Sequence, residues 1–398
     1  MANDISLVLR AMRWHRMVIA LIVVQIAMAC AILGNGLNLV SQRYVLQRVS
    51  TGLTENRLVV LDMEVLQGRL DDTMRDEVLA KIDKIPGIDS TAYVNALPFS
   101  GRGSTFKFVH RGELERQMDG ALYYGSRGFM KVLGVRIMSG RGFRADDFRE
   151  GSQGPLAAAD KIILSKSLAR RLAALPGSRI EVAGRALTVI GIADDVMTPS
   201  LIDPGAAANT AFIPSLPVGA GSYRIVANTR QDATPQAVSA IVSEATRVTP
   251  RTLAWSAQMF GQIRADYFAI DRAVIRLILG MAAVLALVVA AGVGGLSSYW
   301  ITCRHKQLAI RRALGARKAD IARYLHVENL IITSMGGVLG IMGSLVMSEG
   351  LARWLTLPPI QVAPLLWGAL AMIAIGQFAV LAAIRRAVTI PATGLKAA

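Results

Sequence analysis

Four long apolar stretches constrain this chain more than any other feature of its sequence. They cover residues 17–40, 273–302, 325–351 and 363–384. Each is long enough to cross about 30 Å of hydrocarbon as a helix, which takes roughly 20 residues. The overall hydrophobic content of 53% is also above the share usual for a soluble domain. We therefore predict an α-helical membrane protein with four transmembrane helices.

Between the first two stretches, residues 41–272 have ordinary polar content and form an interval large enough for one or two globular domains. We predict a large α+β domain inserted between helices 1 and 2. Residues 41–94 and 218–272 each read as strand, helix, strand, which predicts two βαβ-like halves related by an internal repeat. Residues 95–217 are rich in Gly and short β-like runs, which predicts an inserted subdomain.

Local signals place the elements of the two halves. The expected strands are residues 58–61, 91–94, 223–228 and 251–255. The expected helices are residues 72–84, stopped by Pro86 and Gly87, and residues 235–247, capped by Thr234 and opened by Pro235. In the subdomain, strands are expected at residues 106–110, 161–164 and 187–192.

The formal net charge of +16 is unevenly distributed. Residues 41–272 hold 29 of the 44 basic and 24 of the 28 acidic residues, so the remaining 15 basic and 4 acidic residues belong to the membrane part. There the basic residues gather before the first stretch, between the second and third, and after the fourth. This positive-inside pattern predicts cytosolic segments at residues 1–16, 303–324 and 385–398, a short outer loop at 352–362, and an extracytoplasmic inserted domain. The basic residues beside the membrane stretches also account for the positive net charge, so nucleic-acid binding is not needed to explain it.

The loop after the second stretch carries a specific string, Arg-His-Lys-Gln-Leu-Ala-Ile-Arg-Arg-Ala-Leu-Gly-Ala, at residues 304–316. Further strings include Gly-Arg-Gly-Phe at 140–143, Asp-Asp at 146–147 and Ile-Pro-Ala at 390–392. Together they resemble the MacB/FtsX-like family of ABC transporter permeases over nearly the whole chain. Where that family commonly has an acidic residue followed by Ile-Gly, this chain has Gln307, Leu308 and Ala309.

The resemblance implies a non-enzymatic permease subunit in a bacterial inner membrane, paired with a second permease chain as a homodimer or heterodimer. No Gly-x-x-x-x-Gly-Lys-Ser/Thr loop occurs in the sequence, so ATP and Mg are expected on a separate ABC ATPase and no cofactor on this chain. The implied role is mechanotransmission that drives export of a peptide, lipoprotein or amphiphilic antibiotic. A periplasmic adaptor and an outer-membrane conduit are further partners that the resemblance suggests. The alternative is an FtsX-like regulator that activates a cell-wall hydrolase.

Apart from the resemblance, the string at 304–316 also predicts a local structure on physical grounds. A helix over residues 304–314, ended by Gly315 in a left-handed conformation and followed by a second helix, would form a rigid cytosolic elbow that fits an apolar groove on an ATPase. The predicted coupling residues are Arg304, Leu308, Ile310, Arg311, Arg312, Ala313, Leu314, Gly315, Ala316 and Ile321.

Small residues at four-residue spacing predict close helix packing, either within the chain or between two copies. They are Gly336, Gly340 and Ser344 in the third stretch and Ala291 and Gly295 in the second. Gln25 and Gln377 lie inside apolar stretches and are expected to find partners in the helix bundle.

The remaining motifs do not predict a catalytic site. Ser104 and Lys107 match Ser-x-x-Lys, but the motifs that accompany it in penicillin-binding enzymes are missing from the sequence. The four histidines are scattered, which predicts no metal site. Cys30 and Cys303 fall at different depths of the predicted membrane part, so no disulfide is expected between them.

Overall fold

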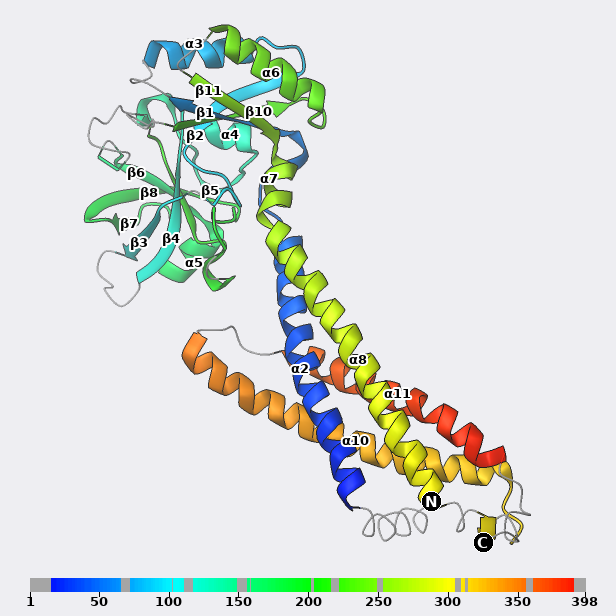
Figure 1. Ribbon diagram of the computed structural model, residues 1–398. Helices are drawn as coiled ribbons and strands as arrows, with labels where there is room; N and C mark the ends of the chain where they lie inside the picture. The colour runs from blue at the N-terminus through cyan, green and yellow to red at the C-terminus, as the bar shows by residue number, and fades with distance from the viewer. Residues whose placement is uncertain are drawn as a thin grey trace. The chain divides into compact units, whose positions relative to one another are not determined.

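The computed structural model describes residues 16–65, 72–101, 103–110, 117–148, 156–157, 159–201, 204–215, 222–248, 253–304, 309–311, 314–355 and 361–389. The chain forms two compact units (Figure 1). One unit holds Met1–Gln47 and Asp271–Ala398, and the other holds Arg48–Ile270. Each unit is described by itself below.

Four long helices make up the first unit. They are α2 (Arg16–Arg48), α8 (Ala269–Cys303), α10 (Lys318–Leu355) and α11 (Val362–Thr389). Each is long and apolar enough to cross a membrane. The prediction of four membrane helices with an α+β domain between the first and the second is confirmed.

The helices extend past the apolar stretches that predicted them. The first apolar stretch ends at residue 40, whereas α2 continues to Arg48. The third begins at residue 325, whereas α10 already starts at Lys318. Hydropathy marks the part of a helix that lipid can surround, but a helix ends only where a cap or a breaker stops it.

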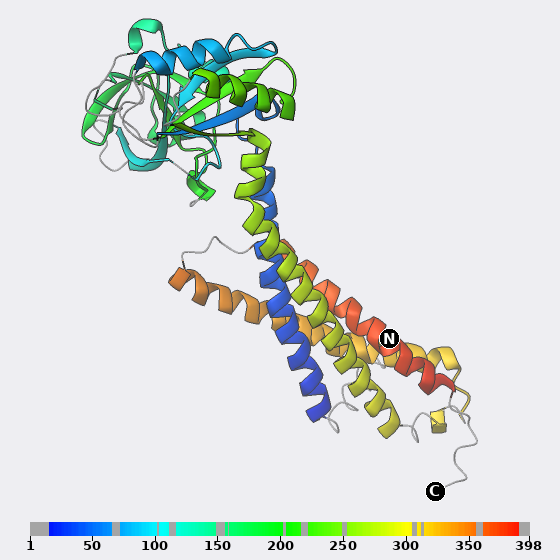
Figure 2. The same cartoon turned by 45° about the horizontal axis from the view of Figure 1, so that its top comes forward.

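The four helices share one apolar core. Ile22 and Ile26 of α2, Val289 of α8 and Met372 of α11 are almost fully buried in it. In both views α2 runs beside α8 and α10 beside α11 (Figures 1 and 2). Much of α8, in contrast, faces away from the rest of this unit.

The second unit contains a four-stranded antiparallel sheet in the order β11-β1-β10-β2. Its strands are β1 (Leu58–Val65), β2 (Ile88–Val94), β10 (Ser222–Thr229) and β11 (Leu253–Met259). The helices α3 (Asp72–Ile82) and α6 (Pro235–Val248) cover one face, where Val78 and Ile241 are fully buried (Figure 1). Thr234 caps α6 as predicted, because its hydroxyl accepts a hydrogen bond from the Ala237 backbone N–H.

The two βαβ-like halves do not form separate layers. β1 and β2 come from the first half, yet β10 of the second half lies between them, and β1 lies between β10 and β11. This is the split βαβ arrangement, in which each half supplies a strand to the gap left by the other. A two-stranded half would expose most of its strand edges, and interleaving the halves pairs those edges.

The segment predicted as an inserted subdomain forms a seven-stranded sheet in the order β5-β8-β6-β9-β4-β3-β7. Its strands are β3 (Thr105–His110), β4 (Gln117–Tyr124), β5 (Ile137–Gly140), β6 (Lys161–Ser165), β7 (Arg179–Val182), β8 (Arg185–Ala193) and β9 (Thr210–Ile213). β7 also pairs with β8, so the sheet closes on itself around an apolar core.

Short helices fill the connections of this unit. They are η1 (Glu55–Arg57), α4 (Phe129–Leu133), η2 (Ala145–Asp147), α5 (Lys166–Leu172), η3 (Pro204–Ala206) and α7 (Phe260–Tyr267). Ser104 precedes β3 and Lys107 lies within it. No group of three or more His, Cys, Asp or Glu side chains that could hold a metal ion occurs among the described residues.

Candidate functional site: the elbow between α8 and α10

The elbow begins where α8 ends. Arg304 lies in a turn just after Cys303, so the helix predicted from residue 304 does not start there. Ala309–Arg311 are helical, while residues 305–308 and 312–313 are outside the described part of the chain. The predicted coupling residues Leu308, Arg312 and Ala313 therefore have no structural description.

The second half of the elbow is a capped turn. Gly315 has a φ of +98°, which is the left-handed conformation predicted for it. Leu314 N–H donates to the Ile310 carbonyl and Ala316 N–H to the Arg311 carbonyl, which satisfies carbonyls left open at the helix end. The Asp320 carboxylate accepts a hydrogen bond from Arg317 N–H at 3.0 Å and so caps the start of α10. The turn is thus fixed from both sides.

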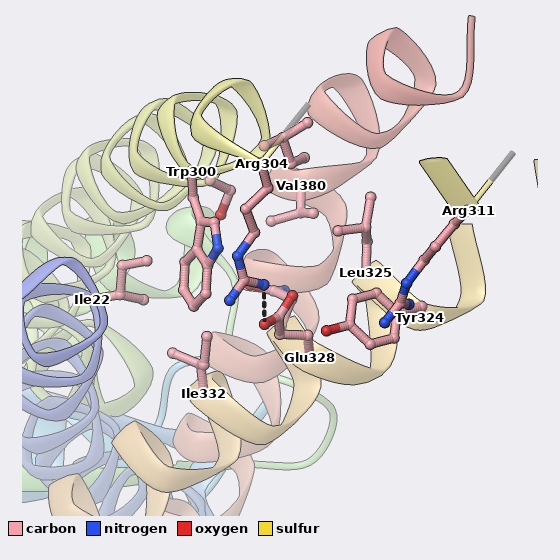
Figure 3. A pocket seen from close by; sticks show the side chains of 12 residues that line it. Ile22, Trp300, Arg304, Arg311, Tyr324, Leu325, Glu328, Ile332 and Val380 are labelled. Atoms are coloured by element: carbon pink, nitrogen blue, oxygen red, sulfur yellow. Dashed lines mark hydrogen bonds and ion pairs between the residues drawn. The ribbon is translucent and has the colours of Figure 1, made fainter. Parts of the chain in front are cut away.

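A buried ion pair closes the base of the elbow (Figure 3). The Arg304 guanidinium donates to a carboxylate oxygen of Glu328 on α10 at 2.8 Å, and the two side chains are only 9% and 6% exposed. The guanidinium also lies 4.7 Å from the ring centre of Trp300, a cation–π distance. Because Arg304 directly follows α8 and Glu328 lies within α10, this pair joins the two helices that carry the elbow.

The same close-up shows a second basic residue on an aromatic ring. The Arg311 guanidinium lies 4.6 Å from the ring centre of Tyr324 on α10 (Figure 3). Between these contacts is a cavity of about 50 Å³, lined by Ile22, Glu328 and other residues. Binding pockets for drug-sized ligands measure roughly 300–1,000 Å³, so this cavity is too small to hold cargo of that size.

The apolar residues predicted for coupling divide into two groups. Ile321 is buried, and Ala316 packs against the core of the bundle. Leu314 and Ile310 point outward, with 82% and 50% of their surfaces exposed. The structure therefore presents an exposed apolar tip on a base held by buried contacts.

Sequence reasoning did not select Glu328 and Trp300 as site residues. A signal for Glu328 was present, because this acidic residue lies inside the apolar stretch 325–351, and charged residues within membrane spans are rare and have partners. Its partner could not be read from the sequence, because Arg304 is 24 positions away and one basic residue among several in the loop.

The small residues of α10 pack against α2 of the same chain. A Cβ built at Gly336 would lie 2.8 Å from the Ile26 Cβ, and one at Gly340 would lie 2.4 Å from the Cys30 Cβ. Ser344 is fully buried and its hydroxyl accepts a hydrogen bond from Asn35 at 2.8 Å. Backbones this close leave no space for a larger side chain.

The pair predicted in the second stretch behaves differently. Ala291 and Gly295 are exposed, and a Cβ at Gly295 would meet nothing within 4 Å among the described residues. The close approaches of α8 occur instead at Gly292, beside Gln25, and at Gly294, 3.2 Å from the Ala379 carbonyl oxygen.

Polar residues inside the bundle find partners as expected. Gln25 donates to the Val288 carbonyl at 3.3 Å, and the Gln377 side-chain oxygen lies 3.1 Å from His326 Nδ1. At the other end of α8, Asp271 forms an ion pair with Arg43 of α2. α2 and α8 are therefore tied together at the ends that lead into the second unit.

Comparison with known families divides the chain into two matched regions. Residues 17–245 match the family model described as MacB-like periplasmic core domain, and residues 279–392 match the model described as FtsX-like permease C-terminal. The first match alone covers more than half of the chain.

Similar proteins agree with this assignment. The chain is 42% identical over 73 residues to a macrolide export ATP-binding/permease protein MacB from Burkholderia thailandensis, which covers 18% of this chain and 11% of that protein. It is 41% identical over 66 residues to a probable syringafactin export ATP-binding/permease protein SyfD from Pseudomonas syringae pv. tomato, covering 16% and 10%. The matched stretches are thus about a tenth of the length of these relatives.

Solved structures also resemble parts of this chain. The periplasmic region of MacB from Actinobacillus actinomycetemcomitans is 14% identical, with a TM-score of 0.34, and covers 54% of this chain and 94% of that structure. The extracellular domain of the noncanonic ABC-type transporter YknZ from Gram-positive bacteria is 15% identical, with a TM-score of 0.33, and covers 50% and 99%.

Proposed function

Because this chain belongs to the MacB/FtsX-like family of ABC transporter permeases, we propose that it transmits the ATP-driven motion of a separate ATPase to its extracytoplasmic domain. ATP and Mg²⁺ would bind to that ATPase and not to this chain. The proposed outcome is export of a peptide, lipoprotein or amphiphilic antibiotic. The four apolar helices and the periplasmic core domain are those of a bacterial inner-membrane protein.

The exposed tip of the elbow is the observation that carries the proposal. Leu314 and Ile310 are apolar and largely exposed, although the turn that presents them is capped on both sides. An apolar side chain on a rigid turn suits insertion into a groove of a partner protein. Arg311 and Arg317, beside the tip, would face acidic residues at the rim of that groove.

The base of the elbow supports transmission of force. Arg304 and Glu328 join the end of α8 to α10, so a push on the tip would move both helices together. At the opposite end of α8, within the same unit, the ion pair between Asp271 and Arg43 ties this helix to α2. With few charges inside the spans, the bundle does not provide the polar lining of a channel, and movement of the helices is the better account.

The outward face of α8 supports pairing with a second permease chain. Ala291 and Gly295 are small, exposed and four residues apart, which lets another helix approach closely. A homodimer and a heterodimer both satisfy this geometry.

The tip is tested with Leu314→Asp. The variant should express normally but bind the ATPase at least about fivefold more weakly in detergent pull-down, because truncating or charging a central apolar anchor costs more than 1 kcal/mol. The matched control is Leu175→Asp, which places the same charge at a 68% exposed leucine of the other unit. Undiminished capture of the ATPase by Leu314→Asp would refute the elbow as the docking element.

The proposed orientation can be tested with the native cysteines. Cys303 is exposed at the end of α8 and Cys30 is buried, so a membrane-impermeant maleimide should label Cys303 alone. Labelling is expected in inverted vesicles and not in intact spheroplasts. The reverse result would place the elbow on the outer side and exclude docking to a cytosolic ATPase.

A further inference from the structure

The second unit contains a cavity that the coupling function does not use. It measures about 400 Å³ and lies between α4, β5 and the segment that leads into η2. Phe129 forms part of its wall and is almost fully buried, whereas Phe143 and Phe148 are only half-buried. Cavities of this size hold small ligands, and their walls are mostly apolar and aromatic.

The three rings form a continuous aromatic wall. The ring centres of Phe129 and Phe143 are 6.3 Å apart with the planes 21° from parallel. Phe143 and Phe148 meet edge to face at 5.9 Å. Such offset and edge-to-face arrangements are the ones a further aromatic ring can extend. A planar ring is therefore the group that this wall favours.

The segment that carries Phe143 and Phe148 is held in place by a buried carboxylate. Asp147 accepts a hydrogen bond from Arg141 at 2.6 Å and another from Arg144 N–H at 2.8 Å, and it forms an ion pair with Lys161 of β6. The Arg141 guanidinium, together with these other donors, lowers the pKa of Asp147 well below its ordinary range. The two rings are thus fixed before any ligand arrives, which reduces the entropy lost on binding.

The polar part of the wall is basic. Lys131 and Arg136 line the cavity, and none of the described lining residues carries a carboxylate. Arg136 pairs with Asp194 at 2.8 Å, so its charge is largely balanced. No ion pair of Lys131 is seen among the described residues, and Lys131 is an exposed residue. An apolar ligand that also bears a negative charge therefore complements the site.

We propose that this cavity binds an aromatic ring with a nearby carboxylate, as found at the carboxyl end of a peptide that finishes in an aromatic residue. The ring would stack against Phe143 and Phe148, and the carboxylate would lie beside Lys131. Binding of this kind goes beyond energy coupling and does not depend on it, since it needs neither the elbow nor an ATPase.

The test uses benzophenone-4-carboxylate as a photoreactive probe on the full chain in lipid nanodiscs, with no ATPase present. Irradiation should attach the probe to the peptide that contains residues 128–148, as located by mass spectrometry. N-acetyl-phenylalanine should compete for this labelling, while decanoate, an aliphatic carboxylate, should compete at least tenfold less well. Better competition by decanoate would overturn the preference for a ring.

Variants connect the labelling to the cavity. Phe143→Ala should weaken labelling about tenfold or more, because a stacking surface is lost. Lys131→Gln should weaken it about two- to fivefold, since Lys131 is an exposed residue, and should leave labelling by the neutral benzophenone-4-carboxamide unchanged. The matched control is Met138→Ala, which removes a 55% exposed side chain of β5 that does not line the cavity.

A cavity-filling variant keeps the test valid if Phe143→Ala is poorly folded. Gly142 lines the cavity, its φ is outside the left-handed region, and a Cβ there would meet only the Ile137 side chain, at 3.8 Å. Gly142→Leu should therefore fold normally and block labelling. Labelling of residues 128–148 that survives in Gly142→Leu would refute the site. That result would not count against the proposed coupling function, which the ATPase pull-down with Leu314→Asp tests separately.

Discussion

Arg264 of α7 donates to both carboxylate oxygens of Glu55, at 2.7 and 2.6 Å, and so joins the segment before α8 to the segment after α2. A second guanidinium nitrogen of Arg264 donates to the Val49 carbonyl at 2.8 Å. The guanidinium also lies 5.5 Å from the ring centre of Phe99, a buried residue with a left-handed φ of +62°. One side chain thus links three segments of the second unit.

Replacing Arg264 should loosen the contacts between these segments. In Arg264→Leu, hydrogen exchange at the amides of Thr51–Arg57 should become about tenfold faster, because hydrogen bonds to charged groups contribute about 1.5–3 kcal/mol. Hydrogen–deuterium exchange of the full chain, read by mass spectrometry, measures this. Arg247→Leu, which breaks an exposed ion pair to Glu244 on α6, is the control and should leave the exchange unchanged. Equal exchange in both variants would contradict the linking role.

The Arg304–Glu328 pair should be sensitive to loss of one partner. Glu328→Gln and Arg304→Gln each remove one charge of this buried ion pair, and breaking such a pair costs about 3–5 kcal/mol. Both should melt at markedly lower temperature in detergent, as measured by differential scanning fluorimetry. The double variant Arg304→Leu with Glu328→Leu should recover much of the loss, because neither charge remains. If the double variant loses the sum of the two single losses, the residues are not coupled.

Close packing of α10 on α2 gives a third prediction. Gly340→Leu should destabilise the bundle by about 1–3 kcal/mol or more, because its side chain would collide with Cys30 and the Ala27 carbonyl. Gly343→Leu is a matched control on the same helix, since a Cβ there meets nothing within 4 Å among the described residues. Thermal unfolding in detergent should separate the two variants. Equal stability would mean that the two helices do not meet at Gly340.

The lowered pKa of Asp147 predicts a pH effect on the second unit. A carboxyl group whose pKa is lower in the folded than in the unfolded state, where it is about 3.9, stabilises the fold above that value. The contribution is lost as the pH falls through the lower, folded-state pKa. Asp147→Asn should therefore be less stable than the unmodified chain at pH 7, and the difference should shrink as the pH falls below about 4.

The β-sheet circular dichroism signal, followed during heating at several pH values, measures that difference. Asp146→Asn is the control, since Asp146 is the exposed neighbour of Asp147. A gap between Asp147→Asn and the unmodified chain that stays constant down to pH 2 would show that ionisation of Asp147 does not stabilise the fold.

Local signals in the sequence predicted much of the fold. Thr234 caps α6 and Gly315 takes a left-handed turn, because both effects depend on neighbouring residues only. Long apolar stretches predicted the four membrane helices, and this signal is local too. The hydropathy of about 20 adjacent residues decides whether a helix can cross a bilayer.

Only the tertiary structure decided which distant segments meet. It placed β10 between β1 and β2, paired Arg304 with Glu328 and turned Gly340, but not Gly295, toward another helix. It also gathered Phe129, Phe143 and Phe148 around one cavity. The sequence determines the elements through short-range energetics. Their partners depend on strand register and helix rotation, which are set by the packing of the whole unit.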